Sequence, residues 1–439
     1  MFSQDCPKVP NVLSIINFIS RIALATVLSL AVGFNTLAQT NEAEQLFNTL
    51  KPALYQIRLI EQATGNKSSI GSGFQIDDSG VIATNYHVIS DYVQYEDKFR
   101  LEYLDHQGNK APLEVLDVDV INDLALVKRT DAATAFFALA GQSPAQGEKI
   151  FSLGNPHDLG MIVVPGTYNG LKDKSFYDRI HFTGSVNPGM SGGPTVNLNG
   201  EVVGINVATA GNQIGFLVPL DKLSQLYQRY QSRGDAVANL KQLIGEQLHA
   251  NQQRLFDLVL NADWHVKTLG TAKVPGEIAS FIRCWGRSNA DKKDAKYLSA
   301  VSNCIMDEQV YLSQNFRSGN IGMQYEWLKT DELNRYRFYN MYQESVANMG
   351  ADTRAGKNDV TEYECNHNLV ATNNGNTNSK AVICSRAYKE YPGLFDVAFI
   401  AASYDKEQQG LISHFTLSGV EKALALKFTE KFMESATWN

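Results

Sequence analysis

The first half of the chain alternates between short apolar segments and polar turns, a pattern typical of β-strands. Turn residues such as Asp78-Ser79-Gly80 and Gln107-Gly108-Asn109 separate the apolar segments. Almost no helical periodicity lies between them, so a β-sandwich or a β-barrel is expected. The predicted strands are 53–61, 70–76, 80–83, 99–103, 113–118, 124–128, 149–153, 179–183, 201–207 and 214–218.

The pattern changes to helical spacing directly after Pro219. Apolar side chains recur every three or four residues from Leu223 to Tyr230, and after a break a second helical run covers 237–260. These segments predict a helix that closes the β-rich domain and a helical connector that follows it.

Beyond residue 266 helical and strand-like patterns are mixed, which predicts an α+β domain. Ser418 and Glu421 form a capping box, so we expect a last helix with Leu424, Phe428 and Phe432 on its apolar face. The other predicted helices are 277–287, 295–316 and 331–349, and the predicted strands are 381–386, 395–402 and 411–417.

The longest apolar segment lies near the start of the chain and has the form of a secretory signal peptide. It covers 22–34 behind the basic Arg21, whereas a membrane-spanning helix needs about twenty apolar residues. Thr36 and Ala38 are the small residues of a cleavage site after Ala38. An uncleaved membrane anchor stays open as the alternative, because 11–20 is also fairly apolar. We expect a signal peptide at 1–38, export to the periplasm or the extracellular space, and no stable membrane span after cleavage.

The expected export bears on whether the cysteines form disulfide bonds. Cys6 would leave with the signal peptide, and an even number of cysteines in an exported chain favours disulfide bonds. Four cysteines allow three pairings, and the sequence does not choose among them. A zinc site is disfavoured because closely spaced pairs such as C-x-x-C are absent. The spacing favours two local bonds, Cys284 with Cys304 and Cys365 with Cys384.

The length of the chain indicates how many domains it contains, and its net charge limits the kinds of partner that it can bind. A chain of 439 residues corresponds to two or three domains. The net charge of −7 at pH 7 lacks the positive excess that binding to nucleic acid or anionic lipid requires. We place the β-rich domain at 45–235, the helical connector at 236–266 and the α+β domain at 267–439.

Three segments of the β-rich half carry residues suited to acyl transfer. His87 follows the strand predicted at 80–83 and Asp123 directly precedes the strand predicted at 124–128, and each is a weak signal alone. The segment from Asn187 to Pro194 is more informative, because three glycines around Ser191 let consecutive N–H groups face one small space. Such fixed donors meet the charge that develops on a carbonyl oxygen. A phosphate-binding loop would end in GK[ST] and begin a helix, whereas this segment leads back to a strand.

The three segments follow one another in the order His, Asp, Ser, which is the chymotrypsin order. Together with Gly71-Ser72-Gly73-Phe74, Gly154-Asn155-Pro156 and Gly204-Ile205-Asn206, they make 53–226 resemble the trypsin-like, chymotrypsin-fold serine peptidases, and among these the HtrA/Do-like bacterial branch. The resemblance implies two six-stranded β-barrels with the catalytic residues in the cleft between them. It also leads one to expect a PDZ domain after the peptidase, but no PDZ-like sequence is recognisable there.

The resemblance also implies a role for each residue of the three segments. It implies that His87 is the general base, that Asp123 holds the imidazole and that Ser191 is the nucleophile. The backbone N–H groups of Gly189 and Ser191 would form the oxyanion hole. No metal and no organic cofactor is implied.

Met190 departs from the family pattern, and three other residues bear on substrate specificity. Met190 stands before the nucleophile, where HtrA-like members usually have Asn and trypsin has Asp, and a bulky side chain there could press on the oxyanion loop. The candidates for the primary specificity pocket are Ser185, Val186 and Asn206. Ser185 is not the Asp that selects Lys or Arg, and Asn206 is not the His of glutamyl endopeptidases. A small or apolar residue before the cleaved bond remains as the expected preference.

The expected function is an exported serine endopeptidase that cleaves proteins or peptides through an acyl-enzyme intermediate. The alternative is a silent or restrained peptidase-fold protein that acts as a binding or chaperone-like module. Met190 and the unassigned region 267–439 favour this alternative, and the sequence does not indicate an oligomeric state.

Overall fold

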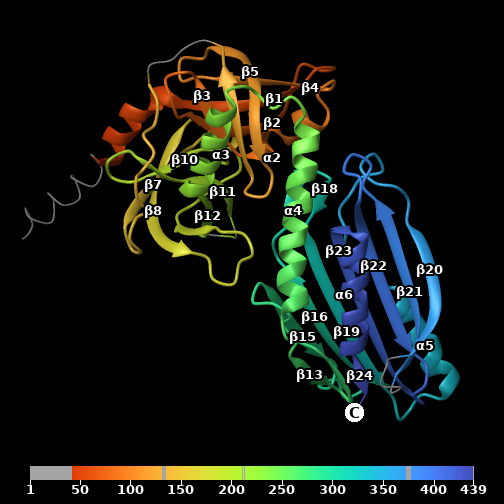
Figure 1. Ribbon diagram of the computed structural model, residues 1–439. Helices are drawn as coiled ribbons and strands as arrows, with labels where there is room; N and C mark the ends of the chain where they lie inside the picture. The colour runs from red at the N-terminus through yellow and green to blue at the C-terminus, as the bar shows by residue number, and fades with distance from the viewer. Residues whose placement is uncertain (1–41, 131–134, 210, 212, 372–376, 439) are drawn as a thin grey trace, which may run out of the picture.

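The β-rich half folds into two closed barrels of six antiparallel strands each (Figure 1), as predicted. The computed structural model describes residues 42–130, 135–209, 211, 213–371 and 377–438, so the predicted signal peptide lies outside the described residues. In strand order the first barrel contains β1 (Leu54–Glu61), β2 (Lys67–Gln75), β3 (Val81–Thr84), β6 (Leu124–Arg129), β5 (Lys110–Asp119) and β4 (Phe99–Leu104). The second contains β10 (Pro194–Val196), β11 (Val202–Thr209), β12 (Gly215–Pro219), β9 (Ile180–Thr183), β8 (Ile162–Leu171) and β7 (Lys149–Gly154).

Two of these strands were not predicted from the sequence. β8 contains Pro165, Gly166 and Gly170, which look like turn residues, and β10 is only three residues long and begins at a proline. Both strands exist because neighbouring strands pair with them, which is a tertiary effect that local patterns do not carry. Each of the ten predicted strands overlaps a strand of the two barrels.

The two barrels share a hydrophobic core, which fixes the cleft between them. Leu54 and Phe74 of the first barrel and Phe151 and Val218 of the second are fully buried in one cluster. Burying one such side chain contributes about 1.5 to 3 kcal/mol. Separating the barrels would expose several of these side chains at once, so groups at the mouth of the cleft keep their relative positions.

Helix α3 (Leu220–Arg233) follows β12 of the second barrel and packs on β5 and β6 of the first as well as on β11 and β12. The side chain of Asp117 on β5 is fully buried and makes ion pairs with two arginines of this helix. Arg229 Nη2 lies 2.7 Å from Asp117 Oδ1, and Arg233 Nη1 lies 3.0 Å from Oδ2. These ion pairs tie the end of the second barrel to the first.

The second half of the chain forms a seven-stranded antiparallel sheet with helices packed on it (Figure 1). Helix α4 (Leu240–Asn261) and helix α6 (Lys422–Ser435) pack against each other and on the central strand β23. No helix within the described ranges is long and apolar enough to cross a membrane. In strand order the sheet contains β15 (Ile282–Ser288), β16 (Leu298–Met306), β19 (Asn320–Lys329), β23 (Gln409–Glu421), β22 (Leu394–Ser403), β21 (Asn378–Ala387) and β20 (Glu364–Ala371).

Smaller elements complete this half. A hairpin of β17 (Val310–Ser313) and β18 (Phe316–Ser318) stands apart from the large sheet, and α5 (Arg335–Ala347) follows β19. A three-stranded sheet joins the end of the chain to the segment after α4; its strands are β13 (Val266–Leu269), β14 (Ala272–Pro275) and β24 (Thr437–Trp438).

Two of the helices predicted in this half are wrong. The segments 277–287 and 295–316 contain strands, namely β15 in the first and β16 and β17 in the second. Apolar residues spaced by three or four positions, such as Leu298, Val301 and Ile305, fit a short strand as well as a helix. The helix predicted at 331–349 and the three predicted strands are confirmed as α5, β21, β22 and β23.

The capping box predicted for the last helix is also wrong. Ser418 belongs to β23, where its hydroxyl accepts a hydrogen bond from Asn320 N at 3.1 Å. Helix α6 begins at Lys422 and has Glu421 as its N-cap residue. The apolar face of the helix is as predicted, with Leu424, Phe428 and Phe432 buried.

Both predicted disulfide bonds are present, and each joins two directly opposed residues of neighbouring strands. Cys284 on β15 pairs with Cys304 on β16, and Cys365 on β20 pairs with Cys384 on β21. The Cα atoms are 4.0 Å apart in each pair. The bonds therefore lock the two outermost strand pairs at opposite edges of the sheet.

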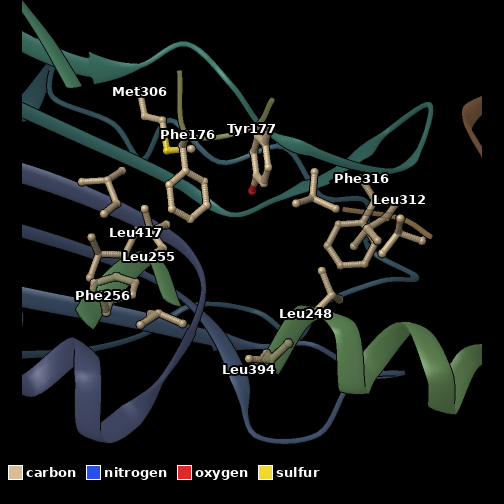
Figure 2. Close-up of a cluster of buried hydrophobic side chains, with 14 of the residues drawn as sticks. Phe176, Tyr177, Leu248, Leu255, Phe256, Met306, Leu312, Phe316, Leu394 and Leu417 are labelled. Carbon is tan, nitrogen blue, oxygen red and sulfur yellow. The ribbon is translucent and has the colours of Figure 1, made fainter. Parts of the chain in front are cut away.

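The two halves meet in a common hydrophobic core along α4 (Figure 2). Phe176 and Tyr177, from the loop between β8 and β9, are buried in this core together with Met306 and other residues of the second half. The Arg254 guanidinium lies 3.9 Å from the centre of the Phe176 ring, and Asn251 Nδ2 donates to Tyr177 Oη at 2.9 Å. A loop of the second barrel is thus inserted into the second half of the chain.

Candidate active site

His87 and Asp123 come together at the open ends of two adjacent strands of the first barrel. His87 is the second residue of a short helix, α2 (Tyr86–Gln94), which follows β3 and was not predicted, and Asp123 directly precedes β6. Asp123 Oδ1 accepts a hydrogen bond from His87 N at 2.8 Å, and Oδ2 lies 2.6 Å from His87 Nδ1. The imidazole is therefore held at Nδ1, and its Nε2 is available to another group.

The backbone of Asp123 is folded to aim its carboxylate back at α2. Its φ of 61° lies in the left-handed region, which Asp and Asn tolerate better than other residues with a side chain. Its carbonyl accepts hydrogen bonds from Asn85 Nδ2 at 2.8 Å and Tyr86 N at 3.2 Å. Both the carboxylate and the carbonyl of Asp123 thus hold the start of α2.

The glycine-rich segment begins with a tight turn that leaves two backbone N–H groups free. Met190 N donates to Asn187 O at 2.9 Å, with Pro188 and then Gly189 between them, and Gly189 has a φ of 96°. This is the sequence preference of a type II turn. A Cβ on Gly189 would lie 2.3 Å from Asn155 O, so only glycine fits. The N–H groups of Gly189 and Ser191 have no acceptor within the part of the chain that the structure describes.

Ser72 on β2 holds the carbonyl groups of this loop away from the free N–H groups. Ser72 N donates to Ser191 O at 2.8 Å, and Ser72 Oγ donates to Gly189 O at 2.7 Å. The same hydroxyl accepts a hydrogen bond from Asn155 N at 2.9 Å. In the sequence Ser72 stands out only as part of the motif Gly71-Ser72-Gly73-Phe74, because a contact across 117 positions to Gly189 leaves no local pattern.

Met190 lies in the core of the second barrel and not on the surface of the loop. Its side chain is fully buried beside Ile150 and Leu217. It packs so closely on Gly154 that a Cβ there would be 2.8 Å from Met190 Cα. Its sulfur accepts a weak hydrogen bond from Asn187 N at 3.5 Å. The bulky side chain fills the barrel core and supports the turn from below.

Ser191 lies at the same cleft as the His87 and Asp123 pair. Its neighbour Gly192 packs on β2 and the start of α2, because a Cβ there would be 2.3 Å from Ser72 O. Ser191 Oγ donates to Val207 O at 3.5 Å, and no hydrogen bond joins it to the His87 ring among the described residues. Catalytic hydrogen bonds are often long before substrate binds, so this geometry is compatible with a nucleophile at rest.

The three specificity candidates have different surroundings. Ser185 is partly exposed, whereas Val186 is buried in the core of the second barrel. Asn206 is fully buried and all its amide atoms are used. Its Oδ1 accepts from Ser152 Oγ at 2.8 Å and Thr195 Oγ1 at 2.7 Å, and its Nδ2 donates to Leu153 O at 2.8 Å. Asn206 therefore braces the strands beneath the loop.

No cluster of three or more His, Cys, Asp or Glu side chains suited to a metal ion occurs among the described residues. The groups at this cleft that fit acyl transfer are the imidazole, the carboxylate, the hydroxyl and the free N–H groups already described.

Comparisons with known proteins place a trypsin-like peptidase domain in this half of the chain. The sequence profile of that family, described as "Trypsin-like peptidase domain", matches residues 71–205. The matched region contains His87, Asp123 and Ser191. The identity predicted for this half from the sequence is confirmed at the level of the domain family.

Several curated proteins that are similar to this chain are named as serine proteases. Serine protease HTRA4 of Homo sapiens is 31% identical over 187 residues, which are 39% of this chain and 38% of that protein. Serine protease HTRA1 of Xenopus tropicalis is 31% identical over 228 residues, 48% of each chain. A protein of Chlamydia trachomatis named "Probable periplasmic serine endoprotease DegP-like" is 31% identical over 160 residues, 34% of this chain and 31% of that one. This chain thus spans less than half the length of these relatives.

A solved structure of a serine endoprotease from Yersinia pestis is also similar to this chain. It has 26% sequence identity and a TM-score of 0.39, and the match covers 44% of this chain and 68% of that one.

Proposed function

We propose that this chain is an exported serine endopeptidase that hydrolyses peptide bonds in proteins or peptides. The observation that carries the proposal is the joint presence, at one cleft, of an imidazole held by a carboxylate and of a glycine-rich turn with two free N–H groups next to Ser191. An acyl-transfer site needs a base, a nucleophile and fixed donors for the developing oxyanion. The similarity to proteins named serine proteases supports the same assignment.

In the proposed mechanism Ser191 Oγ attacks the carbonyl carbon of the bond to be cleaved. Its proton passes to His87 Nε2, and Asp123 stabilises the resulting imidazolium. The C–N bond then breaks, and His87 returns the proton to the leaving amine, which leaves an acyl group on Ser191. A water molecule, deprotonated by His87, attacks the acyl carbon, and the proton returns to Ser191 Oγ as the acid product leaves.

The free N–H groups of Gly189 and Ser191 are proposed to bind the oxyanion of the tetrahedral intermediate. Their donors are held in place before the reaction because Ser72 and the turn fix the carbonyl groups around them. Loss of one such donor typically costs about two to three powers of ten in kcat. No cofactor takes part in any of these steps.

Labelling with a fluorophosphonate probe tests the proposal. We expect the probe to modify the wild-type protein on the peptide that contains Ser191, and casein hydrolysis to stop as the label is added. Ser191→Ala should neither label nor hydrolyse casein, whereas Ser232→Ala, on the exposed end of α3, should do both. Equal labelling of the wild type and Ser191→Ala would overturn the proposal and favour a binding or chaperone-like protein.

Ser72→Ala tests the proposed support of the oxyanion hole. The variant loses the hydrogen bond to Gly189 O and the one from Asn155 N, so the turn should lose its fixed orientation. We expect kcat to fall by about 10- to 100-fold, a fraction of the cost of losing a direct donor, with KM little changed. Ser72→Cys, which keeps a weak donor, should recover part of the loss. Steady-state kinetics would measure kcat and KM, with Ser68→Ala, at an exposed residue of the same strand, as the control. A rise in KM by a similar factor without a fall in kcat would contradict the proposed support of the oxyanion hole.

Export of the protein is part of the proposal. The disulfide bonds are typical of proteins outside the reducing cytosol, and both occur in the second half. The apolar leader at 1–38 supplies the signal. We propose the periplasm or the extracellular space as the place of action.

A further inference from the structure

A cavity of about 360 Å³ lies beside the His87 and Asp123 pair, and both halves of the chain line it. Its volume falls in the range of small-ligand sites, about 300 to 1,000 Å³. Val207, whose carbonyl faces Ser191 Oγ, also lies on its wall. The cavity therefore begins next to the position of the bond to be cleaved. The second half contributes Glu308, Gln309, Tyr311 and Arg317 to its lining.

The wall from the second half is the hairpin of β17 and β18, and it is fixed to the helix that carries His87. Tyr86 Oη donates to Leu312 O at 3.2 Å, and α2 packs directly on β17. The Tyr311 ring centre lies 5.7 Å from that of His87. The hairpin thus keeps a constant position beside the imidazole.

The hairpin borders the cleft without covering the reactive groups. The His87 side chain remains 25% exposed, and Ser191 is partly exposed as well. The space of the cavity lies between the hairpin and the His87 and Asp123 pair. A blocking segment would fill that space, so the arrangement fits recognition of a substrate side chain better than inhibition.

Two guanidinium groups on the cavity wall have no carboxylate partner among the described residues. Arg179, at the end of the inserted loop, donates through Nη1 only to the carbonyl of its neighbour Asp178, at 2.8 Å. The Arg317 guanidinium lies over the Tyr311 ring, 3.6 Å from its centre. Burial lowers the pKa of both groups and outweighs the Asp123 carboxylate, which acts to raise the pKa of each.

The two carboxylates at the cavity are already occupied. Asp123 is bound to His87. Glu308 accepts hydrogen bonds from Lys172 Nζ and Phe176 N, both at 2.8 Å, and from Ser175 Oγ. Burial raises the pKa of Glu308, but these donors outweigh it and hold the pKa below its ordinary value. Glu308 is thus ionised and anchors the inserted loop, and Arg179 and Arg317 are left to face the cavity.

We infer that this cavity is a subsite that selects an acidic side chain of the substrate near the scissile bond, with Arg179 and Arg317 as its cationic wall. Arginine is suited to this task because its planar fork of donors matches a carboxylate. One arginine comes from the barrel half and the other from the second half, so the second half takes part in substrate selection. The inference rests on the proposed peptidase function.

Hydrolysis of a peptide panel tests the subsite. The panel places Glu, Gln or Ala at each of four positions on either side of the bond, in peptides blocked at both ends, and one further set has a free terminal carboxylate. We expect Glu to exceed Gln by about tenfold or more in kcat/KM at one position, as for a charge-assisted hydrogen bond. Arg317→Met, which keeps a chain that can cover Tyr311, should reduce this ratio to near one. Arg287→Met, an exposed arginine of β15, is the matched control.

Four results would overturn the inference. Three of them are an equal rate for Glu and Gln peptides at every position, a preference that survives in Arg317→Met, and an equal rise in the rate of all peptides in Arg317→Met. The last result would identify the hairpin as a restraint on access. A preference limited to peptides with a free terminal carboxylate would likewise contradict a subsite for a side chain.

A binding measurement separates failure of the subsite from failure of the peptidase function. Fluorescence anisotropy of the same peptides with Ser191→Ala and with Ser191→Ala/Arg317→Met does not require turnover. Tighter binding of the Glu peptide only when Arg317 is present would support the subsite even if the wild type hydrolysed nothing. Equal binding of all peptides by both proteins would reject it even if the wild type were active.

Discussion

Replacing Asp123 with asparagine is expected to lower kcat by about four powers of ten and to leave the fold intact. Asparagine has the same shape, and it tolerates the left-handed backbone at this position, where φ is 61°. Its amide oxygen can still accept the hydrogen bond from His87 N, but its NH₂ group then faces His87 Nδ1. The ring must accept there, so Nε2 keeps the proton and cannot take one from Ser191.

Steady-state kinetics on casein or a peptide would measure this loss. Asp119→Asn is the matched control, because among the described residues the Asp119 carboxylate accepts hydrogen bonds only from its own loop, from Ile121 N and from Asn122. We expect that control to keep activity within a few fold of the wild type. A loss of less than tenfold in Asp123→Asn, with thermal unfolding unchanged, would contradict the proposed role of Asp123.

The candidate site was predictable from the sequence to the extent that its groups are carried by local patterns. The glycines around Ser191 and the positions of His87 and Asp123 beside predicted strands were visible in the chain, and the structure places these segments at one cleft. The contacts that hold the candidate site together join residues far apart in the sequence. His87 and Asp123 are 36 positions apart, and Ser72 and Gly189 are 117 positions apart. A local sequence pattern does not reveal contacts between such distant residues, so the contacts of Ser72 could not be predicted.

The barrels were predictable for a similar reason, and the second half was less so. In the barrels most strands are bounded by turn residues, and only β8 and β10 were missed. In β16 the apolar spacing fits a helix as well as a strand, and what decides is pairing with β15 and β19 on either side. The predicted partners of the cysteines were right because cross-strand bonds join residues that are also near in sequence.

The wall of the cavity beside His87 was not predictable from the sequence. The hairpin that carries Tyr311 and Arg317 lies more than two hundred positions after His87, and its first strand, β17, lies inside a segment predicted as helical. Leu312 and Phe316 of this hairpin lie in one hydrophobic core with Phe176 and Tyr177 of the barrel half. The second half therefore shapes the cleft through tertiary contacts alone, which explains why the peptidase pattern of the first half gives no hint of it.

Replacing Arg229 and Arg233 together with methionine is expected to destabilise the barrel half by about 3 to 5 kcal/mol. Asp117 is fully buried, and both of its cationic partners would be lost while its charge stays in place. Either single variant leaves one arginine on the carboxylate, so the double variant should cost more than the sum of the two singles. Methionine keeps most of the apolar stem of each arginine, which limits the loss of packing.

Urea unfolding followed by circular dichroism would measure this loss. Tryptophan fluorescence is less suitable, because all four tryptophans lie at or beyond residue 264 and report on the second half. Arg287→Met, on the exposed face of β15, controls for the loss of a surface arginine. The decisive variant adds Asp117→Asn to the double replacement, because it removes the unpaired buried charge. We expect this triple variant to regain most of the lost stability. A triple variant no more stable than the double one would mean that lost packing, and not the buried charge of Asp117, accounts for the effect.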